Sequence, residues 1–216
     1  MKYEMIVFDW DGTILDSAGA IVRAIQAACR DLGVVVPSDR QASHVIGLGL
    51  LDAMRHAVPD LAPEKHREMA DRYRFHYLSG DHELTLFNGI REMLERLQSA
   101  GHILTVATGK SRLGLDRALA YSGLAPLFQA SRCADECHSK PHPQMLEELM
   151  AEFAVVPGAT LMIGDTSHDL LMARNAGVDS LAVTYGAHTH DHLLEFQPLA
   201  CLHTVPELDQ WLARCA

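Results

Sequence analysis

The sequence lacks long apolar runs and has few basic residues. No stretch approaches the roughly 18–20 apolar residues that a membrane-spanning helix needs. Lysine and arginine together number 18, against 28 aspartates and glutamates, and the formal net charge is −10. Proteins that bind nucleic acid or anionic membranes in a general way present a basic surface. We therefore expect neither a nucleic-acid partner nor a membrane partner.

The sequence also shows no pattern typical of a secretion signal or of a disulfide framework. The N-terminal run MKYEMIVFDW has an acidic residue before a very short apolar stretch, which is not typical of a signal peptide. The five cysteines are an odd number in a chain of 216 residues. This count favours reduced thiols over paired ones, so we expect a cytoplasmic protein.

What is present is the composition of a globular protein, with 48% hydrophobic and 21% charged residues. From residue 17 to about 84, apolar residues recur at helical spacing without a clear strand pattern. Elsewhere, strand-like runs such as 5–10, 102–107 and 159–163 alternate with helical patterns. Such alternation predicts a mostly parallel, doubly wound sheet.

The predicted fold is therefore α/β. A Rossmann-like core would be formed by residues 1–16 and 85–216, and an all-helical domain, residues 17–84, would be inserted directly after the first strand. Ser38 fits the N-cap position of a short helix in this insertion.

Polar residues follow the ends of several predicted strands. Ligands of such sheets bind beyond the carboxyl ends of the strands, so these residues should form one site. They are Asp9 and Asp11 after the first strand, Thr108 after the strand 102–107, Asp165 and Asp169 after the strand 159–163, and Lys140 from the loop SKPHP at 139–143.

This set of side chains points to phosphoryl transfer. Clustered carboxylates suit a hard cation, and Mg²⁺ fits best when phosphate is also present. A hydroxyl and an ammonium suit the non-bridging phosphoryl oxygens, and a carboxylate can act as the nucleophile. Backbone N–H groups at Gly12 and Thr13 can approach the same oxygens. The residues therefore predict Mg²⁺-dependent phosphoryl transfer.

Four segments in order, DWDGTILDS, VATGK, SKPHP and GDTSHD, resemble the four motifs of the haloacid dehalogenase superfamily of phosphohydrolases. The resemblance covers essentially the whole chain, and it is nearest to phosphoglycolate phosphatases. Residues 17–84 resemble the small cap domain of that superfamily. The resemblance implies a Mg²⁺-dependent phosphatase, either monomer or homodimer, that acts on a small phosphorylated metabolite such as 2-phosphoglycolate.

The resemblance also implies a role for each motif residue. Asp9 would attack phosphorus and form an aspartyl phosphate. Asp11 would protonate the leaving alkoxide and then accept a proton from the hydrolytic water. Thr108 and Lys140 would bind the transferring group. The implied metal site comprises Asp9, Asp11 through its carbonyl oxygen, Asp165 and Asp169, and the implied substrate-binding residues are Gly12, Thr13, Gly109, Gly47 and Gly49.

Two other functions stay open. A sugar-phosphate mutase of the same superfamily would return the phosphoryl group to a sugar, but such mutases usually carry a β-branched apolar residue where Thr13 stands. A non-catalytic binding protein could retain the fold, although it would not need Asp9, Asp11, Lys140 and Asp165 together. The family often has asparagine at the position of Gly109, and any contact of that asparagine is missing here.

The segment HVIGLGLLDAM allows two interpretations. Gly47 could simply end a helix, or the loop from Gly47 to Gly49 could lean over the site and direct the next helix N-terminus at a substrate anion. Arg23 or Arg55 could pair with such an anion instead. Because the inserted domain is small, we expect room for only a few carbons beyond the phosphate.

Several polar residues have alternative explanations. Asp16 or Ser17 could cap the first helix or touch the site, and Asp169 could cap a helix or form a salt bridge rather than bind metal. The histidine-rich run AHTHDH at 187–192 is expected to be a solvated loop. The possible zinc ligands Cys133, Cys137, His138 and His142 lack a paired C-x-x-C and are more simply exposed loop residues.

Overall fold

A parallel sheet positions every motif of this protein. The structure is a computed structural model that describes residues 2–80 and 84–215. Within these residues the sheet has six strands in the order β3-β2-β1-β4-β5-β6, and all neighbouring pairs are parallel. The strands are β1 (Met5–Phe8), β2 (Ile103–Thr108), β3 (Ala130–Cys133), β4 (Thr160–Gly164), β5 (Asp179–Val183) and β6 (Cys201–Leu202). The predicted α/β class and doubly wound sheet are confirmed.

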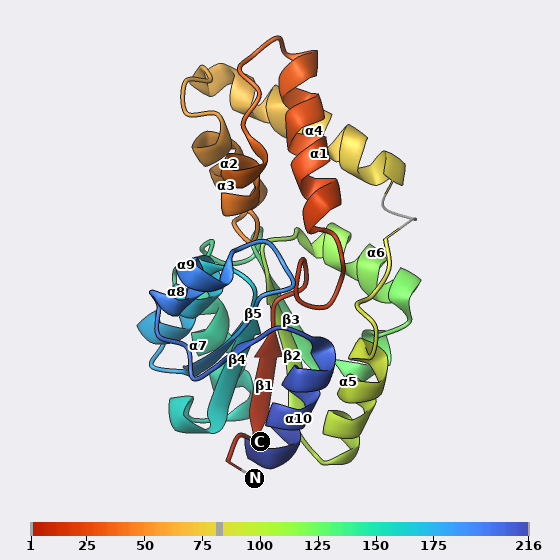
Figure 1. The fold of residues 1–216 in the computed structure, drawn as a ribbon, viewed down its shortest axis with the longest axis vertical. Coiled ribbons are helices and arrows are strands. Elements are labelled where there is room, and N and C mark those ends of the chain that lie inside the picture. The colour runs from red at the N-terminus through yellow and green to blue at the C-terminus, as the bar shows by residue number, and fades with distance from the viewer. Residues whose placement is uncertain (1, 81–83, 216) are drawn as a thin grey trace.

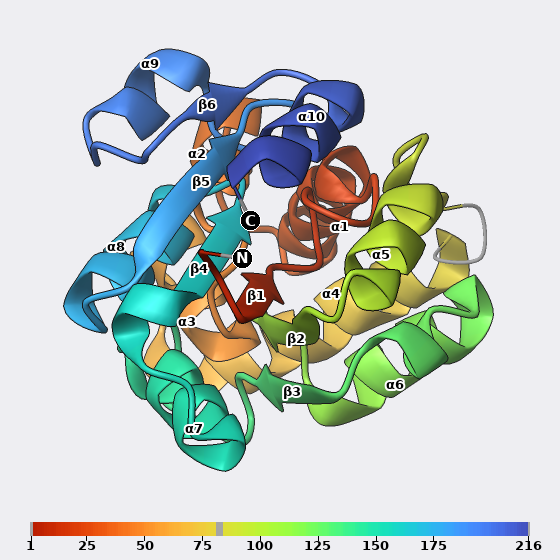
Figure 2. The same cartoon turned by 90° about the horizontal axis from the view of Figure 1, so that it is seen from below.

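Helices cover both faces of this sheet (Figure 2). Successive side chains of a strand point to opposite faces, and β1 is buried on both sides. Ile6 and Phe8 belong to one hydrophobic cluster, whereas Met5 and Val7 belong to another. The first cluster is covered by α5 (Ile90–Ser99), α6 (Arg112–Ser122) and α10 (Val205–Cys215), and the second by α7 (Gln144–Phe153) and α8 (Ser167–Asn175).

A further group of helices lies beyond the carboxyl ends of the strands (Figure 1). This helical group consists of α1 (Ala18–Asp31), α2 (Asp39–His44), α3 (Leu50–Ala57) and α4 (His66–Gly80). It has its own hydrophobic cluster, in which Ile25 of α1 contacts a core shared with Met54 and Met69. Ser38 caps α2 as expected, in a capping box with Gln41. The division into a core and an inserted cap domain stays a prediction, and residues 81–83 at its predicted boundary lie outside the described residues.

Some elements differ from the sequence-based expectation. The first strand ends at Phe8 rather than at residue 10. The run 187–192, expected to be a loop, contains the start of α9 (His190–Leu194). Trp10, which directly follows Asp9 in the chain, is fully buried in the core and packs edge-on against Phe128. Of the helices that the structure describes, none is long and apolar enough to span a membrane.

Candidate active site

The structure brings four of the predicted residues into one buried cluster at the carboxyl end of the sheet. Asp9 follows β1, Asp165 follows β4, and Asp169 lies in the first turn of α8. Ligand atoms of these three carboxylates lie within 4.8 Å of one another. The Lys140 ammonium is 2.8 Å from Oδ1 of Asp9 and 2.6 Å from Oδ1 of Asp169. Distant segments therefore meet in one site, as the parallel topology requires.

The cluster carries an excess of negative charge in a buried place. Burial, followed by the nearby negative charges, raises the pKa of Asp165 well above its ordinary value. Burial also raises the pKa of Asp9 to about 7, although Lys140 opposes the shift. Burial disfavours the charged form of Lys140, but the charges of Asp169 and Asp9 raise its pKa overall. One ammonium does not balance three carboxylates, so the cluster is electrostatically suited to a further cation.

The donor set fits a hard divalent cation. Both carboxylate oxygens of Asp9 are buried without a hydrogen-bond donor of ordinary geometry, despite the ion pair with Lys140. Buried carboxylate oxygens need a hydrogen bond or a metal ion. Oxygen ligands are those that Mg²⁺ prefers. The three carboxylates therefore fit a divalent cation, and Mg²⁺ with Asp9 and Asp165 among its ligands stays a prediction.

Contacts with neighbouring loops fix the orientation of Asp165. The hydroxyl of Thr13 donates to its Oδ1 at 3.0 Å, and the backbone N–H of Ala187 donates to its Oδ2 at 2.7 Å. Gly12 has φ +78°, and a Cβ at this position would lie 2.1 Å from Oδ2 of Asp165. Gly186 was not identified from the sequence, and an added Cβ there would lie 2.2 Å from the same Oδ2 of Asp165. Its only sequence signal is a glycine shortly after a strand.

Asp169 caps a helix and forms a salt bridge at the same time. Its Oδ2 accepts hydrogen bonds from the backbone N–H and the hydroxyl of Thr166, at 3.1 and 2.7 Å. Its Oδ1 accepts from Lys140. Asp169 therefore forms both the helix cap and the salt bridge that were considered as alternatives to metal binding. Its contact with Lys140 also holds the ammonium beside Asp9. A direct role of Asp169 as metal ligand stays a prediction.

Asp11 lies at the edge of the cluster, and its carboxylate has different partners. Its Oδ1 accepts a hydrogen bond from the hydroxyl of Ser17 at 2.7 Å and lies 3.1 Å from the ammonium of Lys110. Ser17 occupies the N-cap position of α1 but makes no side-chain cap hydrogen bond. Its hydroxyl therefore serves Asp11 rather than the helix. The expected ligand atom of Asp11 is its main-chain carbonyl oxygen, and that role stays a prediction.

The loop from Gly47 to Gly49 does lean over the site. A Cβ on Gly109 would lie 2.6 Å from the carbonyl oxygen of Gly47 and 2.5 Å from that of Leu48. The N–H of Gly49, the N-cap of α3, donates to the hydroxyl of Ser139 at 2.7 Å. The missing side chain at Gly109 thus lets the loop pack directly on the end of β2. Substrate contacts of the loop stay a prediction.

A large cavity separates the helical group from the sheet. Its volume is about 870 Å³, and Asp11, Gly47, Gly109 and Lys110 contribute to its lining. The space is wide and partly open to solvent, so the expected room for only a few carbons in an enclosed site stays a prediction. Arg23 and Arg55, the proposed partners of a second anion, are not among its lining residues.

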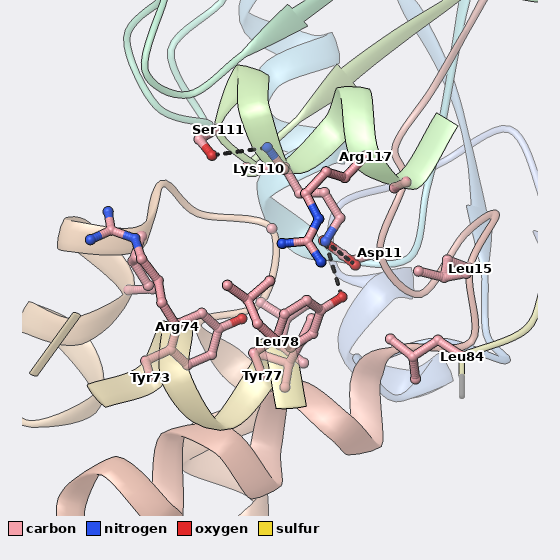
Figure 3. A pocket seen from close by; sticks show the side chains of 18 of the residues that line it. Asp11, Leu15, Tyr73, Arg74, Tyr77, Leu78, Leu84, Lys110, Ser111 and Arg117 are labelled. Atoms are coloured by element: carbon pink, nitrogen blue, oxygen red, sulfur yellow. Dashed lines mark hydrogen bonds and ion pairs between the residues drawn. The ribbon is translucent and has the colours of Figure 1, made fainter. Parts of the chain in front are cut away.

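Lys110 is the main site residue that sequence reasoning missed. Figure 3 shows its side chain between Asp11 and the Tyr77 hydroxyl of α4. The ammonium donates to that hydroxyl at 3.1 Å and lies 4.8 Å from the centre of the tyrosine ring. Lys110 is the last residue of the motif VATGK, so its place at the end of β2 could be seen in the sequence. No local pattern predicted its contact with a helix of the helical group.

Histidines form a second polar cluster between α2 and the core. His188 is buried, contrary to the expected solvated loop. His44, His188 and His192 form the other group of possible metal ligands within the described residues. However, Nδ1 of His188 accepts a hydrogen bond from the backbone N–H of Ser167 at 3.0 Å, and Nε2 faces the carbonyl oxygen of His44 at 3.4 Å. A neutral imidazole with both nitrogens so engaged is a structural contact rather than a metal ligand.

The cysteines near Lys140 do not support a zinc site. Cys133 lies in β3 and packs fully buried in a hydrophobic cluster, not in an exposed loop as expected. In the part of the chain that the structure describes, these cysteines do not belong to a group with three converging ligand atoms.

Comparisons with known proteins agree with this geometry. The family model described as haloacid dehalogenase-like hydrolase matches residues 6–183. A protein of Dickeya dadantii named "Probable phosphatase IndB" is 34% identical over 94% of this chain and 91% of its own length. A phosphoglycolate phosphatase of Aliivibrio fischeri is 32% identical over 90% of each chain.

A solved structure adds support for the whole architecture. A hydrolase of the haloacid dehalogenase-like family from Streptococcus pneumoniae superposes with a TM-score of 0.84 at 26% identity, and the match covers 98% of this chain and 99% of that one. The similarity therefore extends over the sheet and the helical group together.

Proposed function

The chain belongs to the haloacid dehalogenase-like hydrolase family, and from this premise we propose that it is a Mg²⁺-dependent phosphatase that hydrolyses a phosphate monoester through an aspartyl-phosphate intermediate. The observation that carries the proposal is the buried Asp9 carboxylate, which pairs with the Lys140 ammonium but has no hydrogen-bond donor of ordinary geometry. An unsolvated carboxylate at the open end of a sheet is suited to nucleophilic attack.

In the first step, the formation of the aspartyl phosphate, the residues around Asp9 have separate roles. The Asp9 carboxylate attacks phosphorus, and the bond to the leaving alkoxide breaks. Lys140 and the Thr108 hydroxyl bind the non-bridging oxygens and oppose the repulsion between two anions. Mg²⁺, held by Asp9, Asp165 and Asp169 together with the carbonyl oxygen of Asp11, would supply further charge neutralisation.

Asp11 acts as the general acid and then as the general base. It delivers a proton to the leaving alkoxide, and in the second step it accepts one from the water that attacks the aspartyl phosphate. Its contact with Ser17 fixes the orientation of the carboxylate. Gly12 and Thr13 support the phosphoryl oxygens through the backbone, while Gly47, Gly49 and Gly109 form the edge against which the substrate binds.

The wider proposal includes the cap and the surroundings of the enzyme. Residues 17–84 act as a cap domain on a core of residues 1–16 and 85–216, and closure of the cap excludes water during the reaction. We further propose a cytoplasmic enzyme, monomeric or dimeric, with a phosphorylated metabolite as substrate. 2-Phosphoglycolate is the first candidate to test.

A substrate panel tests the proposal. Purified protein with Mg²⁺ is assayed for phosphate release from 2-phosphoglycolate, a hexose phosphate, a nucleotide and pyrophosphate. Release from at least one ester, its loss on chelation and its recovery with added Mg²⁺ are expected. Asp9→Asn, which keeps size but not nucleophilicity, should abolish turnover in a folded protein.

The same panel separates the alternatives. A mutase would isomerise the hexose phosphate with little free phosphate. A binding protein would bind an ester without turning it over. Near wild-type activity in folded Asp9→Asn would contradict the covalent mechanism, and full activity after exhaustive chelation would contradict the metal.

A further inference from the structure

The cavity between the helical group and the sheet continues directly from the proposed catalytic residues. Asp11, the proposed acid for the leaving group, is part of its lining. Whatever alcohol leaves phosphorus must therefore lie in this cavity. Its volume of about 870 Å³ is near the upper end of ordinary ligand pockets. The few atoms of glycolate would fill little of it, since one water takes about 30 Å³ of liquid.

The walls of the cavity are mainly apolar. Leu48 and Leu50, around the start of α3, line it from the helical group, while Leu84 and Leu86 line it from the segment that returns to the core. Figure 3 shows Leu15 and Leu84 on the side of the cavity near Asp11. Apolar walls stabilise an apolar ligand through the water that it displaces.

Large apolar side chains are also exposed to solvent on two sides of the cavity. Leu78 of α4 is 42% exposed, and Leu113 of α6 is 73% exposed. Both belong to the cavity lining, although they come from helices on opposite sides of it. Exposed apolar residues that gather around a pocket mark a surface that binds an apolar partner. This observation is independent of the cavity volume.

Several polar groups of the cavity already have partners within the protein. Lys110 contacts Asp11 and Tyr77, Arg74 forms a salt bridge with Asp71, and Arg117 is also engaged. A leaving group rich in hydroxyls or with a second anion would lose its hydration and would have to displace these contacts to gain new ones. That loss is unfavourable.

We propose that the substrate is a phosphate monoester of a bulky, mainly apolar alcohol, whose carbon skeleton lies in the cavity bounded by Leu50, Leu78 and Leu113. This inference rests on the proposed phosphatase function and specifies its substrate class. A second anion, as in 2-phosphoglycolate, is not needed for binding. Larger apolar leaving groups should therefore give higher kcat/KM.

A series of alkyl phosphates tests the inference. Ethyl, butyl and hexyl phosphate have leaving groups of nearly equal acidity, so only the apolar area changes along the series. Burial of each methylene should raise kcat/KM by up to about fourfold. Hexyl phosphate should exceed ethyl phosphate by at least tenfold, and it should also exceed 2-phosphoglycolate and a hexose phosphate.

Two matched variants locate the effect. Leu78→Asn replaces a partly exposed lining residue, so the fold should tolerate it, and the hexyl-to-ethyl ratio of kcat/KM should fall severalfold. Phe75→Asn is the control on the same helix, since Phe75 is 64% exposed and is not a lining residue. The ratio should be unchanged in Phe75→Asn.

The outcomes distinguish this inference from the proposed function. A ratio near one or below one, with hydrolysis of 2-phosphoglycolate or a sugar phosphate, would overturn the substrate class and leave the phosphatase intact. An unchanged ratio in Leu78→Asn would overturn the assignment of this cavity. If none of these esters were hydrolysed, both the function and the inference would fail.

Discussion

The ammonium of Lys140 lies 2.8 Å from Oδ1 of Asp9, and neither side chain has appreciable contact with water. The lysine also pairs with Asp169, so it links Asp9, the proposed nucleophile, to the first turn of α8. Removing one partner of a buried ion pair leaves uncompensated charge in a place of low polarity. The same lysine should therefore matter both for catalysis and for stability.

Replacement of Lys140 by methionine should destabilise the metal-free protein. The loss is expected to be on the order of 3–5 kcal/mol at neutral pH, because Asp9, Asp165 and Asp169 then repel one another without a counter-charge. Urea denaturation measures it, and added Mg²⁺ should restore part of the loss. Arg55→Met is the control, since its ion pair with Asp52 is exposed. Equal stability in both variants would contradict the importance of the pair.

Asp11→Asn should slow poor leaving groups more than good ones. An alkyl phosphate needs a proton at its leaving oxygen, whereas an activated aryl phosphate does not. The loss on the alkyl ester should be about 10²–10⁴-fold, and that on the aryl ester much smaller. Steady-state kinetics on the two esters measure the difference. Equal losses would instead indicate a role for Asp11 in structure or metal binding.

Gly109→Ala should disturb the loop that covers the site. The new Cβ would lie 2.5 Å from the carbonyl oxygen of Leu48, so the loop must move. We expect a clear rise in KM with only a modest loss of stability. Gly158→Ala is the matched control, since nothing lies within 4 Å of its added Cβ. An unchanged KM in Gly109→Ala would show that the loop does not contribute to substrate binding.

Acid should destabilise the protein in part through His188. Burial, followed by the charges of His168, His44 and His192, lowers the pKa of His188 to about 4. The unfolded chain, with an ordinary pKa of 6.5, therefore binds more protons between these values. The contribution of His188 to stability is complete above about pH 6.5 and is lost as the pH falls toward 4.

Thermal unfolding at pH 7 and pH 4.5 measures this dependence. His188→Gln keeps a polar side chain but cannot be protonated in this range, so its loss of stability between the two pH values should be smaller. His56→Gln, at an exposed position, serves as the control and should behave as the wild type. The same pH dependence in all three proteins would exclude His188 as the cause.

The proposed catalytic residues could be placed at one edge of the sheet from sequence for a topological reason. Asp9, Thr108 and Asp165 each follow a buried apolar run, and parallel strands deliver their carboxyl ends to one edge. The spacing of apolar residues likewise predicted the helices on both sides of the sheet. These inferences need only local patterns, because a strand or helix is largely specified by its own periodicity.

The contacts across the cavity were decided by tertiary structure. Lys110 pairs with Asp11 and with Tyr77, a residue 33 positions earlier in the chain, and no local pattern links them. The burial of His188 and the width of the cavity depend in the same way on how α2 and α4 pack against the core. The sequence by itself determined which groups reach the edge of the sheet. Packing between distant segments determined which partners they have and how much space remains, because side-chain contacts depend on where whole elements lie and not on their internal period.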